Sequence, residues 1–434
     1  MKHFRIDRIL IVRILALAAI AAMLSATGAR AASRERVLYN FQGGSDGSYP
    51  VAGLVTDKAG NLYGTTTAGG SGSCSSSDGV GCGTVFELSS VAGGGWTEKV
   101  IYTFQAGQDG SYPEAGLTFD AAGTLYGVTR AGGGGGCNDL EPGCGTVFEL
   151  TLGIGGTWTE NVLYRFEGGS DGSTPISGLV FDHAGNIFGT TEAGGGLACQ
   201  LGCGTVFKLT PSTQGWVETI LYAFAGGTDG DTPEGRLVLD RAGNLYGATN
   251  VGGASGFGTI FKLIPNSSGA WSETILYSFG GNKDGSVPNG VISDKAGDLF
   301  GTNFNGGHNG YGAVFELSSK GKESLLFNFG GSGVNGESPR SGLTFDAAGH
   351  LYGTTEYVTA GGSGEVFMLT PNTQGGWTKG TLYVFSGGSD GGQPFGNVIL
   401  DSRGHVYGTT WTGGTGNCSG NNGTGCGVVF EIVQ

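Results

Sequence analysis

An aspartate within a glycine-rich segment recurs along the chain, first in F-Q-G-G-S-D-G-S-Y-P at residues 41–50. A ring of carboxylates could bind calcium, but calcium takes six to eight oxygen ligands and each segment offers one aspartate. The alternative is a turn, in which the side chain accepts a backbone N–H and the following glycine is left-handed. Asparagine, present in one repeat, makes the same turn without charge. We predict no metal and interpret these residues as structural: Asp46, Asp109, Asp171, Asp229, Asp284, Asn335 and Asp390.

Two positions differ between the repeats although their neighbours stay the same. Directly after the G-T-T motif the chain carries Thr67, Arg130, Glu192, Asn250, Phe304, Glu356 and Trp411. Directly after the recurring proline it carries Val51, Glu114, Ile176, Glu234, Asn289, Arg340 and Phe395. Such a mixture of acidic, basic, amide and aromatic groups suits a ligand site, although drift at exposed positions is an equally good explanation. We predict ligand contacts from the whole first set and from Glu114, Glu234, Arg340 and Phe395.

Trp411 stands apart from the other five tryptophans, each of which begins the last strand of a repeat. Tyr311 and Tyr357 lie in the corresponding loops of other repeats, and we add both tyrosines to the predicted ligand site. Aromatic rings on a rim can stack on sugar faces or peptide side chains. Packing of Trp411 into the core remains the alternative.

Catalysis by paired carboxylates would have to use Glu114, Glu192, Glu234 and Glu356. No local motif links these four glutamates, and neither G-x-S-x-G nor H-E-x-x-H is present. We therefore expect binding rather than catalysis, with no cofactor. A polysaccharide hydrolase or lyase remains the alternative, and a purely structural envelope protein is the third.

Seven repeats of 50 to 63 residues position these side chains. The pattern of each repeat predicts four strands, which we call A to D. In the first repeat they are A-G-L-V-T-D, N-L-Y-G-T-T, G-T-V-F-E-L and W-T-E-K-V-I-Y-T-F. A D strand, R-E-R-V-L-Y-N-F, precedes the first complete repeat, and the chain ends on a C strand, C-G-V-V-F-E-I-V-Q. A closed ring explains this offset, because the first D strand completes the last sheet. The sequence predicts an all-β, seven-bladed β-propeller.

The repeats resemble those of the GloVer tandem-repeat proteins, an exported bacterial family with recurring D-x-x-G-N-L-Y-G-T-T and G-T-V-F segments. The resemblance covers residues 37–434. It implies the repeat fold and export, and it implies no established activity.

Loops D-to-A and B-to-C should emerge on one face of the propeller, around the channel mouth. Cysteines occur in the B-to-C loops of repeats 1, 2, 3 and 7. The B-to-C loops of repeats 4, 5 and 6 lack cysteines and are shorter. We therefore expect a ligand to enter over repeats 4 to 6, beside Phe304, His308, Tyr311 and Glu356.

The eight cysteines form four close pairs, and local disulfides are the favoured interpretation in an exported protein. A zinc site would need two pairs brought together with no histidine at ligand spacing. The predicted bonds are Cys74–Cys82, Cys137–Cys144, Cys199–Cys203 and Cys418–Cys426.

Residues 1–31 combine basic residues, a short apolar run and Ala29-Arg30-Ala31, which predicts a cleaved signal peptide rather than a signal anchor. Residues 32–434 would form one domain, periplasmic or extracellular, with 17 Lys and Arg against 35 Asp and Glu. This acidity argues against nucleic acid and anionic lipid as partners. We expect a monomer that does not insert into membranes and that binds a glycan or an extracellular protein.

Overall fold

The computed structural model describes residues 33–76, 79–137, 143–196, 199–331, 336–358, 361–420 and 423–434. The predicted signal peptide, residues 1–31, and Asn335 lie outside these ranges. Among the described residues, no helix has both the length and the apolar character that a membrane crossing requires.

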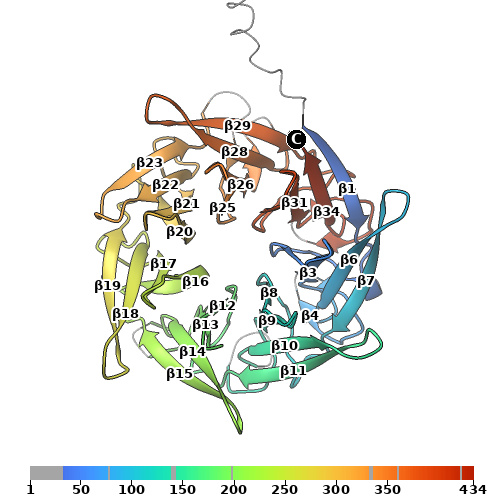
Figure 1. The fold of residues 1–434 in the computed structure, drawn as a ribbon, viewed down its shortest axis with the longest axis horizontal. Coiled ribbons are helices and arrows are strands. Elements are labelled where there is room, and N and C mark those ends of the chain that lie inside the picture. The colour runs from blue at the N-terminus through green and yellow to red at the C-terminus, as the bar shows by residue number, and fades with distance from the viewer. Residues whose placement is uncertain are drawn as a thin grey trace, which may run out of the picture.

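Seven four-stranded antiparallel sheets surround a central axis, as predicted (Figure 1). Blade 1 comprises β2 (Val55–Thr56), β3 (Leu62–Thr66), β6 (Thr84–Val91) and β7 (Gly95–Thr103). Blade 2 comprises β8 (Thr118–Phe119), β9 (Leu125–Thr129), β10 (Thr146–Leu152) and β11 (Trp158–Arg165). Blade 3 comprises β12 (Val180–Phe181), β13 (Ile187–Thr191), β14 (Thr205–Ser212) and β15 (Gly215–Ala223). Blade 4 comprises β16 (Asp231–Leu239), β17 (Leu245–Val251), β18 (Thr259–Pro265) and β19 (Trp271–Ser278).

The remaining blades follow the same order around the ring. Blade 5 comprises β20 (Ser286–Ser293), β21 (Leu299–Asn305), β22 (Ala313–Leu317) and β23 (Glu323–Asn328). Blade 6 comprises β25 (Thr344–Phe345), β26 (Leu351–Thr355), β28 (Glu365–Pro371) and β29 (Trp377–Val384). Blade 7 comprises β30 (Ile399–Leu400), β31 (Val406–Thr410), β34 (Val428–Val433) and β1 (Arg34–Asn40). Outside the blades lie η1 (Gly44–Asp46), β4 (Ser75–Ser76), β5 (Gly79–Val80), β24 (Gly336–Glu337), β27 (Tyr357–Val358), β32 (Ser419–Gly420) and β33 (Gly423–Thr424).

The two ends of the described chain close the ring. Strand β1 pairs antiparallel with β34, with Arg34 opposite Val433 and Asn40 opposite Val428 (Figure 1). The outer strand of blade 7 is therefore supplied by the beginning of the propeller sequence. This closure confirms the interpretation of the offset repeats and leaves no blade short of a strand.

The innermost strands are shorter than the sequence suggests. In blades 1, 2, 3, 6 and 7 strand A contains two residues, whereas β16 and β20 contain nine and eight. In blades 4 and 5 strand A is continuous up to the channel mouth, as in Asp231 opposite Val251. In the other blades strand A is interrupted and the equivalent pairing recurs separately, as in Ser48 opposite Ala68. The inner wall of the other blades is formed by irregular backbone.

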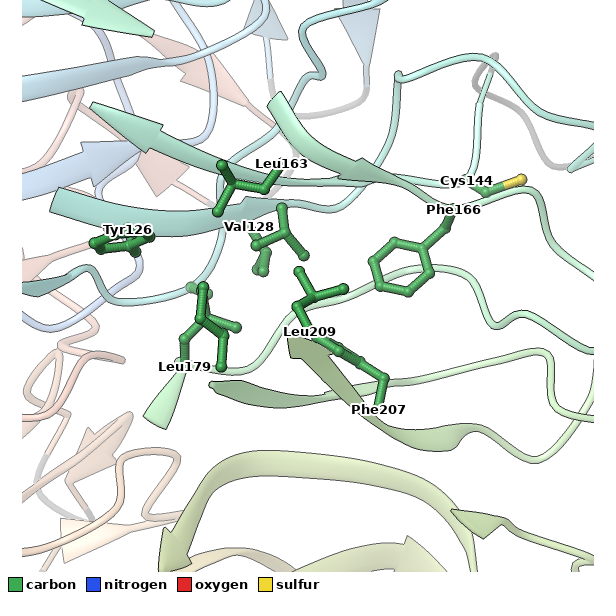
Figure 2. Close-up of a cluster of buried hydrophobic side chains, with 11 residues drawn as sticks. Tyr126, Val128, Cys144, Leu163, Phe166, Leu179, Phe207 and Leu209 are labelled. Carbon is green, nitrogen blue, oxygen red and sulfur yellow. The ribbon is translucent and has the colours of Figure 1, made fainter. Parts of the chain in front are cut away.

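Phenylalanines join each blade to the next. Phe41, at the end of β1, meets Phe86 of blade 1 edge to face with 5.1 Å between ring centroids. Equivalent pairs occur at the other six junctions, at 5.0–5.2 Å. A side chain on Gly64 would put its Cβ 2.6 Å from Cζ of Phe86, so glycine is required in the L-Y-G-T-T strand. Figure 2 shows the resulting core between blades 2 and 3, where Phe166 and Phe207 lie among aliphatic side chains.

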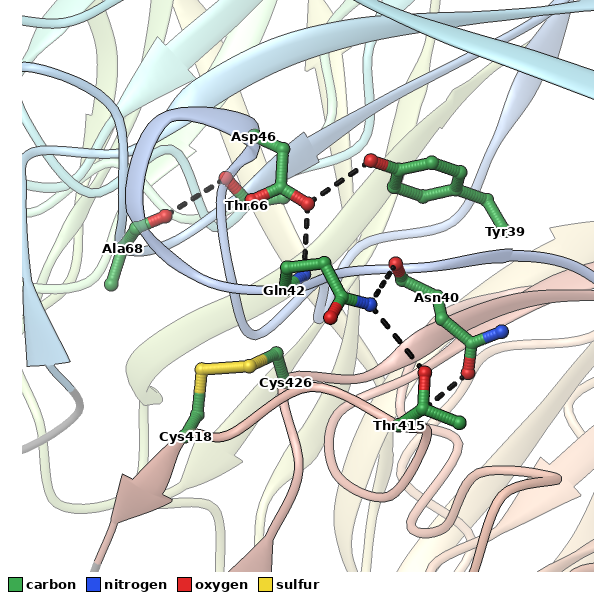
Figure 3. The surroundings of a disulfide bond; sticks show 9 residues. All are labelled: Tyr39, Asn40, Gln42, Asp46, Thr66, Ala68, Thr415, Cys418 and Cys426. Carbon is green, nitrogen blue, oxygen red and sulfur yellow. Dashed lines mark hydrogen bonds between the residues drawn. A yellow bond between two sulfur atoms is a disulfide. The ribbon is translucent and has the colours of Figure 1, made fainter.

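Asp46 fastens the loop between β1 and β2 onto the end of β1. Its Oδ2 accepts the N–H of Gln42 at 2.8 Å and the hydroxyl of Tyr39 at 3.0 Å (Figure 3). The donors precede the aspartate by four and seven residues, and the tyrosine is a partner that sequence reasoning missed. The same two bonds are made by Asp109, Asp171, Asp229, Asp284 and Asp390.

Candidate functional site

The loops that lead into strand A lie beside the loops that follow strand B. Isolated backbone bridges join them in four blades, at Ser48–Ala68, Ser111–Ala131, Ser173–Ala193 and Gly392–Thr412. Both loop types therefore share one face of the propeller, as predicted from the sequence. The two variable positions of each repeat lie in these loops.

The residue before each recurring proline joins two blades at this face. Tyr49 has a φ of 61°, in the left-handed region that residues other than glycine rarely adopt. Its N–H donates to the carbonyl of Cys426 in blade 7, and its own carbonyl accepts the N–H of Thr67 in blade 1. Such strain persists only where surrounding bonds hold it. The same conformation, with φ of 55–59°, occurs at Tyr112, Thr174, Thr232, Val287, Ser338 and Gln393.

A cavity of about 750 Å³, here called the mouth cavity, lies where these turns converge. All seven residues after the prolines line it: Val51, Glu114, Ile176, Glu234, Asn289, Arg340 and Phe395. Five of the seven residues after G-T-T also line it: Thr67, Asn250, Phe304, Glu356 and Trp411. Tyr357, Val287 and Asn305 complete the wall.

Three of the predicted ligand residues do not line the mouth cavity. Arg130 extends to Glu114, with 3.3 Å between Nη1 and Oε1, and Glu192 lies on the corresponding loop of blade 3. Tyr311 packs against Gly330 of the following loop. The exposed His308, suggested as part of the approach, also lies outside the lining.

A stack of three aromatic rings and one arginine crosses blades 5 to 7 on one side of the mouth cavity. The guanidinium carbon of Arg340 lies 5.1 Å from the ring centroid of Phe304 and 5.0 Å from that of Phe395. Phe395 in turn meets Trp411, with centroids 4.9 Å apart and ring planes inclined by 31°. We call Phe304, Arg340, Phe395 and Trp411 the aromatic–arginine stack. It holds a half-exposed cation in a fixed orientation.

Glu356 completes the setting of Arg340. Its Oε2 lies 3.3 Å from Nε of Arg340, and its side chain is almost fully buried. The pair leaves other guanidinium nitrogens of Arg340 available as hydrogen-bond donors, because Arg carries five N–H groups. The stack therefore presents donors beside apolar rings.

Acceptors are concentrated on blade 4. Burial raises the pKa of Glu234, although the amide of Asn250 and the charge of Arg340 favour its ionised form. Asn250 is 9% exposed, and its Oδ1 has no hydrogen-bond partner among the described residues. A buried carbonyl oxygen without a donor is costly, so this atom is suited to a donor group from a ligand.

The mouth cavity continues into a central channel of about 600 Å³, lined in every blade by strand A, by the segment that leads into it, or by both. Arg236 extends across its wall, and its Nε donates to the carbonyl of Leu179 in blade 3 at 3.1 Å. Asn397 lies next to Gly342, a glycine of blade 6. At this level four blades carry glycine, so Arg236 and Asn397 are the two large polar side chains in the channel wall below the mouth cavity.

The four cysteine pairs are disulfide bonds in the structure: Cys74–Cys82, Cys137–Cys144, Cys199–Cys203 and Cys418–Cys426. The second cysteine of each pair precedes strand C and is buried against the next blade, as Cys426 is beneath the loop of Gln42 and Asp46 (Figure 3). Within the described ranges, one group of His, Cys, Asp and Glu side chains has the spacing of a metal site: Cys199, Cys203 and Asp231. The disulfide occupies both sulfur atoms of that group.

A profile of the Gloeobacter/Verrucomicrobia repeat matches residues 27–200, 71–290 and 268–433 in overlapping segments. The chain belongs to the Gloeobacter/Verrucomicrobia repeat family. The resemblance to GloVer repeat proteins is thereby confirmed. A search among curated proteins finds no match for this repeat protein.

Solved structures share the propeller fold with this repeat protein at low identity. The extracellular domain of a protein described as a one-component system from B. thetaiotaomicron is 10% identical, with a TM-score of 0.54 over 91% of this chain and 40% of that chain. An ancestral GH74 enzyme is 13% identical, with a TM-score of 0.54 over 90% of this chain and 48% of that one. A fungal alcohol oxidase of the AA5 family, in complex with copper, is 15% identical, with a TM-score of 0.52 over 91% and 76%. The repeat protein spans less than half of the first two chains, and the likeness shows the fold alone.

Proposed function

We propose that this repeat protein is an exported, non-enzymatic propeller that binds a glycan in the mouth cavity. The observation that carries the proposal is the contrast between a repeating framework and a non-repeating lining. Every blade delivers its post-proline residue to the same place, yet the seven residues include acids, amide, arginine and aromatic groups. Rigid frameworks that present varied side chains are typical of binding sites.

The chemistry of the lining favours a glycan over a protein partner. Carboxylate, amide and guanidinium groups offer several hydrogen bonds each to hydroxyl groups, and aromatic rings supply an apolar wall. A protein interface usually needs a broad surface of about 800 Å² on each partner, whereas the variable residues here converge on one concavity. The disulfides and the net charge of −14 are compatible with an exported protein.

The test begins with residues 32–434 on a glycan array and on cell-envelope polysaccharides. Trp411→Ala and Phe304→Ala should each weaken glycan binding about tenfold or more, as loss of a central aromatic contact does. Ile154→Ala, an exposed change in the loop between β10 and β11, is the control and should bind normally. Binding to no glycan would overturn the proposal. Capture of an envelope protein that is lost in the same variants would replace the glycan by a protein.

A hydrolase is the second candidate, because Glu234, Glu114 and Glu356 line one cavity and burial raises the pKa of Glu234. A general acid in a glycosidase needs such a raised pKa. Glu234→Gln should then abolish the release of reducing ends while glycan binding persists. Absence of reducing-end release by the unmodified protein on every glycan it binds would exclude this candidate.

A further inference from the structure

Two half-exposed aromatic residues replace buried cysteines beside the mouth cavity. The residue two positions before strand C is cysteine in blades 1, 2, 3 and 7, and these cysteines are 0–1% exposed. Blade 4 has Phe257 at this position and blade 5 has Tyr311, each 43% exposed. These rings therefore lie on the binding face, on the side without disulfides.

Each ring is supported by a glycine of the following blade. A Cβ added to Gly281 would lie 2.8–3.0 Å from three ring carbons of Phe257. A Cβ added to Gly330 would overlap the ring of Tyr311. The rings thus rest against backbone, which restricts their motion, while nearly half of each side chain stays accessible to solvent. Fixed, accessible rings of this kind are suited to stacking on sugars.

Backbone hydrogen bonds connect both residues to segments that reach the mouth cavity. The carbonyl of Phe257 accepts the N–H of Val287 at 3.1 Å, and Val287 is part of the cavity wall. The carbonyl of Tyr311 accepts the N–H of Ser338 at 2.9 Å, two residues before Arg340. The backbone of both residues therefore adjoins the cavity wall, and their rings lie on the same face at the junctions of blades 4 with 5 and 5 with 6.

Most of the charged groups in the mouth cavity are paired with one another or with a neighbouring residue. Glu114 is paired with Arg130, and Glu356 is paired with Arg340, so two of the cavity's three carboxylates are already neutralised. What remains is a set of hydrogen-bonding groups, namely Glu234, the free Oδ1 of Asn250 and the guanidinium of Arg340. Hydroxyl groups both donate and accept, and they satisfy acceptors and donors together. An acidic glycan would in addition be repelled by a chain of net charge −14.

We propose that the ligand is a linear, uncharged glycan bound end-on. One terminal sugar occupies the mouth cavity between the aromatic–arginine stack and Asn250, and the following sugars leave over Phe257 and Tyr311. This inference rests on the proposed glycan-binding function and adds the class of glycan, its direction and a second subsite. The position of the two exposed rings supports the end-on arrangement, because they offer stacking surfaces on the face beside the mouth cavity rather than along the channel.

The test is calorimetric titration with cello-, manno- and laminari-oligosaccharides of two, four and six sugars, with oligogalacturonides as acidic counterparts. In at least one uncharged series, affinity should rise about tenfold or more between two and six sugars, since each stacked ring adds binding energy. The double variant Phe257→Ala/Tyr311→Ala should lose most of that rise and bind the disaccharide within about twofold of the unmodified protein. Leu201→Ala, a 61% exposed change on the disulfide-bonded side of the same face, should leave both affinities unchanged.

A second double variant distinguishes the loss of the stacking rings from an effect on folding. Phe257→Leu/Tyr311→Leu keeps apolar cover on Gly281 and Gly330 but removes the flat rings, and it should lose the same dependence on chain length. Retention of that dependence in the leucine variant would overturn the inference, as would tighter binding of oligogalacturonides than of every uncharged series. Disaccharide binding would still support the proposed function in the first case. Binding by none of the glycans would overturn function and inference together.

Discussion

The hydroxyl of Tyr39 donates to Oδ2 of Asp46 at 3.0 Å, and the carboxyl of Glu98 from the next blade faces the same pair. This group of tyrosine, aspartate and glutamate recurs at six blade junctions. In each, one oxygen of the glutamate is buried without a hydrogen-bond partner among the described residues: Glu35, Glu98, Glu160, Glu218, Glu273 and Glu323. Burial, reinforced by the charge of the nearby aspartate, raises the pKa of all six to about 7.

Stability should therefore increase as pH falls from 8 to 5. A raised pKa means that the folded protein holds protons more tightly than the unfolded chain, so the six glutamates destabilise the fold fully above about pH 7. The destabilisation disappears as pH approaches the ordinary value of 4.5. Thermal unfolding followed by circular dichroism should show a higher Tm at pH 5 than at pH 8.

Glutamine variants test whether the glutamates at the blade junctions cause this pH dependence of the Tm. Glu98→Gln combined with Glu218→Gln should reduce the difference in Tm between pH 5 and pH 8. Glu167→Gln, a change at an exposed glutamate in the loop before blade 3, should leave it unaltered. A Tm that rises with pH over this range would contradict the assignment.

The aspartates should act as turn residues rather than as calcium ligands. Asp46→Ala removes the acceptor for Gln42 and Tyr39 and should lower the free energy of unfolding by about 1–3 kcal/mol. Asp46→Asn keeps an acceptor oxygen and should cost less, as Asn335 in the sixth repeat suggests. Denaturant titration measures both changes. An increase in Tm of the unmodified protein on addition of calcium would argue for a metal instead.

At the junction between blades 5 and 6 other residues take the place of the tyrosine and the glutamate, and this replacement can be tested. Phe327 takes the place of the tyrosine and Lys379 that of the glutamate, and Nζ of Lys379 lies 2.7 Å from the fully buried Glu365. Lys379→Met should lower the free energy of unfolding by about 3–5 kcal/mol, because it leaves a buried carboxylate without its counterion. Lys379→Met/Glu365→Thr restores the threonine of other blades and should recover most of that loss. The exposed change Lys58→Met is the control in the same urea titrations.

The pairing of β1 with β34, which closes the ring, should be the main reason why the protein unfolds cooperatively. Removal of residues 1–40 leaves β34 without its partner and should broaden the unfolding transition and cause aggregation through the open edge. Removal of residues 1–32 keeps β1 and should leave the Tm unchanged. Leu38→Ala in β1 should cost about 2–5 kcal/mol, since the side chain is buried between blades 7 and 1. A sharp, unshifted transition after removal of residues 1–40 would show that closure is dispensable.

Much of the fold is predictable from the sequence because its information is local and repeated seven times. The phase of the repeats predicts the ring. The length of strand A was less predictable, because among the described residues it runs uninterrupted to the mouth in blades 4 and 5 alone. The role of Tyr39 was also missed, since its bond to Asp46 follows from the shape of the loop rather than from any motif.

For the candidate site, the sequence by itself determined which positions vary and that each post-proline residue occupies the same place in its blade. Tertiary structure alone decided which of these side chains meet. Phe304, Arg340, Phe395 and Trp411 come from three blades, and their contacts depend on the spacing that ring closure imposes. The same spacing brings Arg130 to Glu114 instead of to the cavity and rests Tyr311 on Gly330. Contacts between distant segments depend on the geometry of the whole ring, which no single repeat contains.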